Sequence, residues 1–240
     1  MERNVCKFSY QLSKKLLPVS SSLVGTVNSY YSGQNKGEKF QGISYLLPKL
    51  KYDYKIIHNG FDSIFWTNKT NTSKLENSFT AVISPSQYYL KGGDLIIQLA
   101  ELNSEYTFFL IGINKPPFID DIPDNIIFLG RISHKEMREY FSKSRFHLQL
   151  SIFEGFGCSL CEAMLCECIP IGSNVNIIPE IIGNSGFILQ HRDIDELNQL
   201  VRSAISGQDK EAKGLSARSR IISKYPIERR INSLVEIIEQ

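Results

Sequence analysis

Short apolar and β-branched runs recur along the chain from about residue 78 onward, and segments with helical spacing separate most of them. The helical segments carry start signals, such as the capping box Ser133-x-x-Glu136 and Asp193 ahead of a periodic apolar stretch. This alternation predicts a doubly wound α/β fold with a mainly parallel sheet. We expect strands at residues 79–84, 107–111, 126–129, 146–150, 169–172 and 186–189, and closing helices at 210–224 and 227–238.

The first 77 residues lack this alternation of apolar runs and helical segments. Their pattern predicts helices at 11–17 and 23–31, a loop rich in Gly, Lys and Ser at 32–42, a strand at 54–58 and a turn at Asn59-Gly60. A second Rossmann-type domain needs roughly 100 residues or more, so this segment is too short to form one. The prediction is therefore one α/β domain preceded by a short helical segment.

Charge and hydropathy narrow the classes of function. The 240 residues include 27 Lys+Arg and 25 Asp+Glu, a net charge of +2. So small a surplus does not favour nucleic acid as a partner, because phosphate binding usually requires a strongly basic surface. No stretch approaches the ~18 apolar residues of a membrane span, and residues 1–17 lack the apolar core of a signal peptide. We expect a cytoplasmic protein.

Four of the five cysteines lie within eleven residues, at Cys158, Cys161, Cys166 and Cys168. Four thiolates could close a tetrahedral zinc site. However, the segment reads as a helix followed by a buried strand, and a reduced cysteine packs like a small apolar residue. Packing is the favoured interpretation, and a zinc module is the alternative.

The loop after the predicted strand 146–150 is the strongest candidate site, because ligands of open α/β sheets collect at the carboxyl ends of the strands. Gly155 and Gly157 allow bare backbone N–H groups to face a ligand, and the following helix start favours anionic oxygens. Glu154 and Glu162 lie on either side of this helix start, and carboxylates accept hydrogen bonds from vicinal hydroxyls. A glycine turn with two solvated glutamates is the alternative.

Several motifs in order resemble the C-terminal half of the retaining GT-B glycosyltransferases of family four. Segments 151–164 and 170–189 carry the likeness, and Glu154 and Glu162 match the two glutamates that this family separates by seven residues. Lys91-Gly92 matches the family's Lys-Gly before a helix. Asn59-Gly60 is similar to the segment where the chain passes between domains. The resemblance covers about residues 54–240 and implies the nucleotide-sugar-binding half of a two-domain enzyme.

The resemblance also implies roles for individual side chains. Lys91 would neutralise the donor diphosphate, Glu162 would hold the ribose hydroxyls, and Glu154 would hold the sugar. Fixed cations and helix starts take the place of a metal ion in this family, so no cofactor is expected. The implied donor is a UDP- or GDP-hexose.

The remaining donor-binding positions implied by the resemblance lie on turns. The Gly130-Arg131 turn would lie beside the base, and the backbone of Gly155, Phe156 and Gly157 would surround the sugar. Where the family usually has a second diphosphate-binding arginine, this chain has Ser86.

The resemblance divides the chain into an N-terminal remnant of an acceptor-side domain (1–53), a donor domain (54–224) and a C-terminal helix that packs back on the N-terminal part (225–240). The implied function is retaining transfer of a hexose to a saccharide or lipid-linked acceptor. A non-catalytic nucleotide-sugar-binding protein, or one half of a split enzyme, is the alternative. The arginines of 218–230 would either contact anionic lipid at the inner face of the membrane or line a solvated helix, which nearby acids favour.

Overall fold

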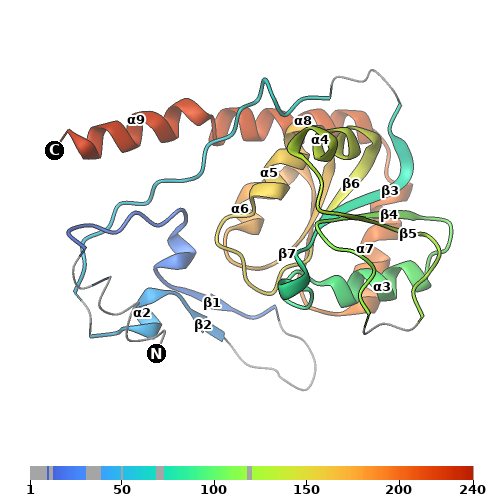
Figure 1. The fold of residues 1–240 in the computed structure, drawn as a ribbon, viewed down its shortest axis with the longest axis horizontal. Coiled ribbons are helices and arrows are strands. Elements are labelled where there is room, and N and C mark those ends of the chain that lie inside the picture. The colour runs from blue at the N-terminus through green and yellow to red at the C-terminus, as the bar shows by residue number, and fades with distance from the viewer. Residues whose placement is uncertain are drawn as a thin grey trace.

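A six-stranded, fully parallel sheet forms the centre of the computed structural model (Figure 1). The structure describes Tyr10 and residues 13–30, 39–49, 51–68, 73–117 and 121–239. The strand order is β5-β4-β3-β6-β7-β8. The strands that follow β3 therefore lie on one side of the central pair β3·β6, and the strands that follow β6 lie on the other side. The strands are β3 (Leu75–Val82), β4 (Thr107–Ile111), β5 (Ile126–Gly130), β6 (Ser144–Gln149), β7 (Ile169–Ser173) and β8 (Phe187–Leu189).

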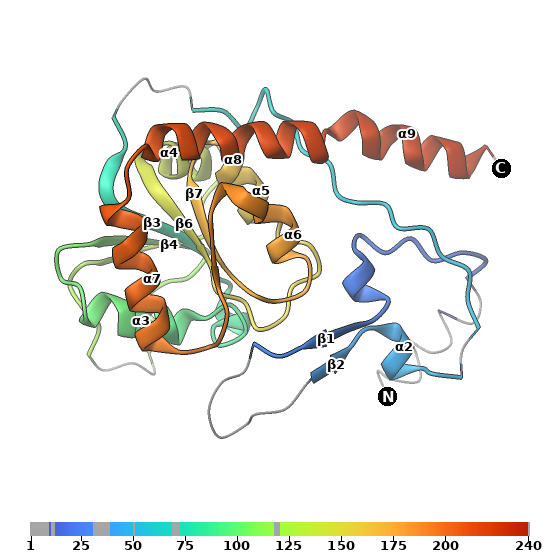
Figure 2. The same cartoon turned by 180° about the vertical axis from the view of Figure 1, so that it is seen from behind.

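Helices cover both faces of this sheet, as Figures 1 and 2 show together. One side carries α3 (Gly93–Glu101) packed beside α7 (Ile194–Ser206). The other carries α4 (His134–Lys143), α5 (Cys158–Leu165) and α8 (Lys210–Lys224), and the short α6 (Ile178–Ile182) packs on β7. The predicted doubly wound α/β fold is confirmed.

Most element predictions after residue 78 hold within a few residues. β4 and α8 have the predicted bounds, and the Ser133–Glu136 capping box is formed. The largest difference is β3, which begins at Leu75, four residues earlier than expected. This extension contains Glu76 and Asn77, whose polar side chains mask the strand pattern.

Three phenylalanines stack through the middle of the core. Phe79 on β3 lies 5.1 Å from Phe108 on β4 and 5.2 Å from Phe146 on β6, measured between ring centroids. All three are fully buried and paired in register across neighbouring strands. Stacked aromatic pairs each add ~0.5–1.5 kcal/mol beyond their area burial, so this row fastens the central strands together.

The amino end of the central strands carries a buried lysine. Lys74 directly precedes β3, and its Nζ donates to the carbonyl oxygens of Phe141, Ser142, Ser144 and Cys166 at 2.9–3.2 Å. These carbonyls lie at the ends of α4 and α5, where backbone acceptors lack helical partners. Lys74 therefore joins two helix C-termini to the sheet.

The N-terminal segment forms an antiparallel pair, β1 (Thr26–Asn28) and β2 (Lys39–Gln41), followed by α2 (Ile43–Leu46). The helices predicted at 11–17 and 23–31 are wrong for their described residues. Leu16 instead exchanges backbone hydrogen bonds with Asp53 and Lys55, and the β-branched pair Thr26-Val27 lies in β1. The strand predicted at 54–58 is also absent, since only Tyr54 forms a bridge, to Leu16.

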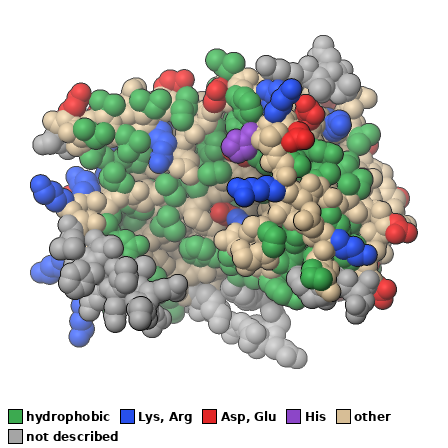
Figure 3. All heavy atoms as spheres, viewed as in Figure 1, with side chains coloured by type: hydrophobic (Ala, Val, Ile, Leu, Met, Phe, Trp, Pro, Cys, Tyr) green, Lys and Arg blue, Asp and Glu red, His purple; other side chains and the backbone are tan. Residues whose placement is uncertain are grey.

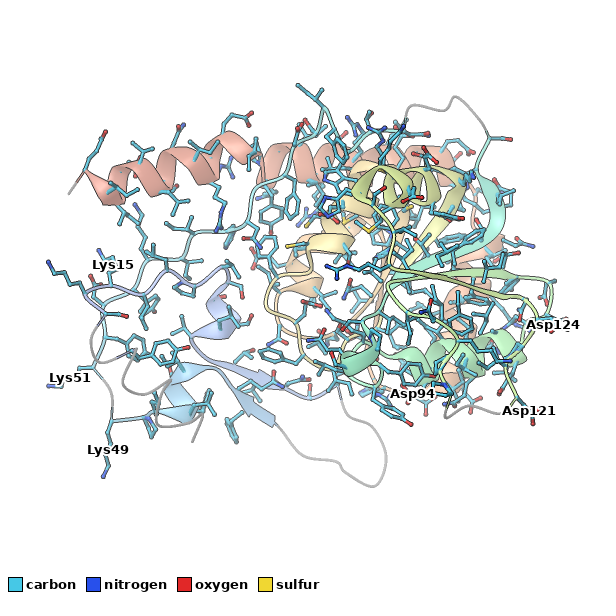
Figure 4. The ribbon with its side chains drawn as sticks, in the orientation of Figure 1. Lys15, Lys49, Lys51, Asp94, Asp121 and Asp124 are labelled. Carbon is cyan, nitrogen blue, oxygen red and sulfur yellow. The ribbon has the colours of Figure 1, made fainter. Side chains whose placement is uncertain are left out.

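Six charged residues on the two parts of the molecule are labelled in Figure 4. Lys15, Lys49 and Lys51 lie on the N-terminal segment, where Lys15 pairs with Asp53 at 3.1 Å. Asp94, Asp121 and Asp124 lie on the α/β domain, where Asp94 pairs with Arg192.

The last helix, α9 (Ile227–Ile238), continues the line of α8 after Pro226 and extends beyond the sheet (Figure 1). Hydrophobic side chains gather over this end of the molecule in Figure 3, and Ile231, Val235 and Ile238 of α9 are exposed. Arg230 donates to the carbonyl oxygens of Ile57 and His58. In the part of the chain that the structure describes, no helix has the length and apolarity to cross a membrane.

Candidate functional site

The candidate site lies where the chain leaves β3 and β6 at their carboxyl ends. Because these two strands are neighbours, the loops that follow them meet, although Lys91 and Glu154 are 63 positions apart in the sequence. Lys91 Nζ lies 2.6 Å from Glu154 Oε2, and both side chains are mostly buried. The structure thus brings together two residues that the sequence analysis placed in the site.

The loop that carries Lys91 is held close against the end of β6. Gly92 has a φ of +74°, and a Cβ atom there would lie 2.5 Å from the carbonyl oxygen of Leu150. The N–H of Ile152 donates to the carbonyl of Leu90 at 2.8 Å. A glycine after the lysine is therefore required both by the left-handed backbone and by the close approach of the two loops.

Two further donors converge on the Glu154 carboxylate. Gln149 Nε2 lies 2.9 Å and Ser151 Oγ 3.1 Å from the same oxygen that Lys91 contacts. Ser159, in the first turn of α5, donates to Gln149 Oε1 at 3.1 Å. Gln149 was not among the residues predicted for the site; its place at the end of β6, directly before the loop that carries Glu154, is the signal that could have found it.

The turn at residues 155–157 presents backbone donors. Within the described residues, the N–H groups of Gly155, Phe156 and Gly157 donate to no protein acceptor. Gly157, with a φ of +92°, begins α5, while the Phe156 side chain turns inward and stacks on Phe61 at 6.0 Å. The turn and the start of α5 therefore form a patch of donors suited to an anion or to sugar oxygens.

Glu162 lies one turn along α5. Burial raises its pKa to about 7. No hydrogen bond or ion pair to its carboxylate is formed by any residue that the structure describes. It thus differs from Glu154, which has three donors, and retains its full capacity to accept hydrogen bonds from a ligand.

The Gly130-Arg131 turn lies apart from this group. Gly130 ends β5, two strands away from β3; its φ is +61°, and a Cβ atom there would lie 2.5 Å from Asn114 Oδ1. Arg131 is exposed and pairs with no acid among the described residues. Ser86 is exposed on a 3₁₀ turn, Pro85–Gln87, between β3 and Lys91.

The N-terminal segment contacts the same loops. Ser20 Oγ donates to the carbonyl of Gly155 at 2.8 Å, and Asn28 Nδ2 donates to the carbonyl of Ile152 at 3.1 Å. Asn176, after β7, accepts from the N–H of Glu154 at 3.0 Å and donates to Gln41 of β2. The site loops are therefore held from both sides, by the sheet and by Ser20, Asn28 and Gln41 of the N-terminal segment.

The four clustered cysteines do not converge. Cys158 is exposed, and its Sγ accepts from Asn59 Nδ2 at 3.3 Å. The other three are buried in the core: Cys161, Cys166 and Cys168. All four belong to the described residues, among which no group of His, Cys, Asp or Glu is arranged to hold a metal ion.

Arginines of the 218–230 stretch bind backbone carbonyls. Arg218 bridges the carbonyls of Ser63, Trp66 and Leu165, and Arg229 binds those of Ser223 and Lys224. Next to Arg229 and Arg230, a pocket of about 260 Å³ reaches Asn59, the residue that contacts the start of α5.

The family model described as glycosyl transferases group 1 matches residues 65–221. The chain belongs to this family. A Klebsiella pneumoniae relative, an uncharacterized 41.2 kDa protein in the cps region, is 26% identical over 88% of this chain and 59% of its own length. An O-antigen chain mannosyltransferase B of Escherichia coli is 30% identical over 30% of this chain and 19% of its own.

Two solved structures of similar fold extend the comparison. Sucrose-phosphate synthase from Thermosynechococcus elongatus has a TM-score of 0.76 at 15% identity, covering 99% of this chain and 61% of that one. Anabaena HepE in complex with UDP-glucose has a TM-score of 0.66 at 18% identity, covering 82% and 58%. This member of glycosyl transferases group 1 thus spans about three fifths of the length of the Klebsiella relative and of these two solved structures.

Proposed function

We infer that this chain binds a nucleotide-sugar donor at the carboxyl edge of its sheet and serves the retaining transfer of a hexose to a saccharide or lipid-linked acceptor. The observation that carries the inference is the convergence on one edge of Lys91, the two carboxylates and the N–H groups of residues 155–157, which find no acceptor in the described part of the chain. This set provides a cation and donors for a diphosphate, with acceptors for hydroxyls beside them.

Lys91 is the proposed diphosphate-binding cation. In transfer, the bond between the anomeric carbon and the diphosphate oxygen breaks, and the electron pair leaves with the diphosphate. The acceptor hydroxyl forms the new bond to that carbon and gives its proton to the departing diphosphate. A fixed ammonium and oriented N–H groups stabilise the leaving group, because a preorganised charge acts strongly in a site that excludes water.

The two glutamates receive different proposed roles. Glu154, already held by three donors, would accept from the sugar hydroxyls with the backbone of Gly155, Phe156 and Gly157. Glu162, whose carboxylate has no donor among the described residues, would accept from the ribose hydroxyls. The Gly130-Arg131 turn, two strands away, would lie beside the base.

The relatives support the proposal in their own terms. HepE is described in complex with UDP-glucose, and the Escherichia coli relative is an O-antigen chain mannosyltransferase. The bound ligand of the one and the described activity of the other fit a UDP- or GDP-hexose donor and a role in polysaccharide or glycolipid synthesis. We propose a cytoplasmic place of action, with a lipid-linked acceptor presented at the inner face of the membrane.

Calorimetry with a panel of UDP- and GDP-sugars tests the donor site. We expect saturable binding of at least one nucleotide-sugar, and a loss of at least tenfold in affinity for Glu162→Ala. The matched control is Glu101→Ala, which removes an exposed glutamate from α3. Absence of binding throughout the panel, or equal affinity of Glu162→Ala and the parent, would overturn the proposal.

A second candidate is a non-catalytic protein that binds a nucleotide-sugar. The chain spans 59% of the length of its Klebsiella relative, and in this candidate residues 1–53 would be a remnant of an acceptor-side domain. The two candidates differ in turnover. A chain that binds the donor tightly, yet transfers no labelled sugar to saccharide or lipid-linked acceptors, favours the second candidate.

A further inference from the structure

Gln149 is a buried amide at the last position of the central strand β6, with only 3% of its surface exposed. Its Nε2 donates to Ser151 Oγ at 2.8 Å and to Glu154 Oε2 at 2.9 Å, and its Oε1 accepts from Ser159 Oγ at 3.1 Å. Burial of an amide is unfavourable unless its hydrogen bonds are made, and here the amide has partners on both atoms.

The chemistry of the partners fixes the direction of every bond. A carboxylate accepts but cannot donate, so the Gln149 amide must turn its nitrogen toward Glu154. Ser159 must then donate to Gln149, and Ser151 gives its single proton to Glu154 while it accepts from Gln149. All donors meet at Oε2, and no described residue donates to Oε1 of Glu154.

The same network reaches the helix that carries the second carboxylate. Ser159 and Glu162 are three residues apart on α5, so they lie on neighbouring turns of one helix face. Gln149 therefore connects the position of α5 to the position of Glu154.

We propose that Gln149 is a positioning residue of the sugar subsite: it holds Glu154 by Oε2 so that Oε1 faces the hydroxyls of the donor sugar. The proposal rests on the proposed function. Its main consequence concerns Lys91, which must turn from Glu154 to serve the diphosphate. Gln149 and Ser151 keep two donors on Oε2 after that exchange, so Glu154 stays oriented.

The test compares ligands with and without the sugar. UDP-glucose is paired with UDP, and GDP-mannose with GDP, in calorimetry on the full chain. For Gln149→Leu we expect the Kd of the nucleotide-sugar to rise at least tenfold, while the Kd of the matching diphosphate changes less than twofold. Ser159→Ala removes one donor and leaves the strand intact. We expect it to change the ratio of the nucleotide-sugar Kd to the diphosphate Kd two- to fivefold.

Ser173→Ala is the matched control. Ser173 is also fully buried at this edge, but its hydroxyl donates to the backbone carbonyls of Gln149 and Ser151 and does not contact the carboxylate. We expect it to leave the ratio of the two Kd values within twofold of the parent.

A double-mutant cycle isolates the pathway through the carboxylate. In a Glu154→Ala background, Gln149→Leu should add less than a twofold change. Equal losses for sugar and diphosphate ligands, or an undiminished effect in the Glu154→Ala background, would assign Gln149 a merely structural role and overturn the proposal. A parent that binds neither the diphosphates nor the sugars overturns the proposed function itself, a result distinct from both.

Discussion

One lysine, Lys74, lies directly before strand β3, and another, Lys91, lies in the loop that follows it. The two lysines differ in their hydrogen-bond partners. Lys74, at the amino end, is buried and donates only to backbone carbonyls, four of them. Lys91, beyond the carboxyl end, pairs with a single carboxylate next to N–H groups that have no partner in the described chain. The amino end satisfies its polar groups internally, whereas the carboxyl end leaves capacity for a ligand.

Replacing Lys74 should have the largest effect on stability. Lys74→Met leaves the carbonyls of Ser142 and Cys166 without this donor, while the Cys168 thiol still reaches those of Phe141 and Ser144. We expect a loss of ~3 kcal/mol in the free energy of unfolding, because buried acceptors without partners are costly. Urea unfolding measures it, and a change below ~1 kcal/mol would show that the two ends are equivalent.

Replacing Lys91 should affect ligand affinity more than stability. Lys91→Met removes one of three donors from the mostly buried Glu154, so we expect a loss of about 1–2 kcal/mol in the free energy of unfolding, smaller than at Lys74. Nucleoside diphosphate affinity should fall by ~2 kcal/mol, or more than tenfold, because a charge-assisted contact is lost. Calorimetry with UDP and GDP measures the loss. Lys210→Met, which removes an ion pair with Glu76 far from the site, is the control.

Glu162 should make the carboxyl end sensitive to pH. Its pKa is raised by burial to about 7, so the folded state holds a proton that the unfolded chain has released. Stability should therefore fall by about 2 kcal/mol as pH rises from about 5 to 8, and Glu162→Gln should remove this part of the slope. Urea unfolding of the parent and of Glu162→Gln at the two pH values measures this change in the free energy of unfolding. Parallel slopes would contradict the assignment.

Replacing Cys158 should have the smallest effect on stability. Burial raises the pKa of its thiol, so we expect slow alkylation by iodoacetamide near neutral pH despite its exposed surface. Cys158→Ala loses one weak contact with Asn59 and should cost under ~0.5 kcal/mol. Thiol titration measures the rate, and rapid labelling at pH 7 would show an activated cysteine at the start of α5.

The sequence analysis predicted the α/β domain and the site loop because their signals are local. Apolar runs, a capping box and paired glycines act within a few residues, as the confirmed β4 and α4 show. It failed at Leu16 and Thr26-Val27, where pairing with distant backbone overrides a weak helical pattern. The Lys91–Glu154 pair and the Gln149 network depend on which strands are neighbours, and local spacing does not carry that information.

The central pairing of β3 with β6 has a consequence for how the protein folds during synthesis. β3 can pair with β4 as soon as residue 111 is available, but its other edge is uncovered until β6, at 144–149, has followed. An apolar edge strand without its partner is a site for aggregation. Slow translation between residues 112 and 149 should therefore lower the soluble yield more than slow translation after residue 173.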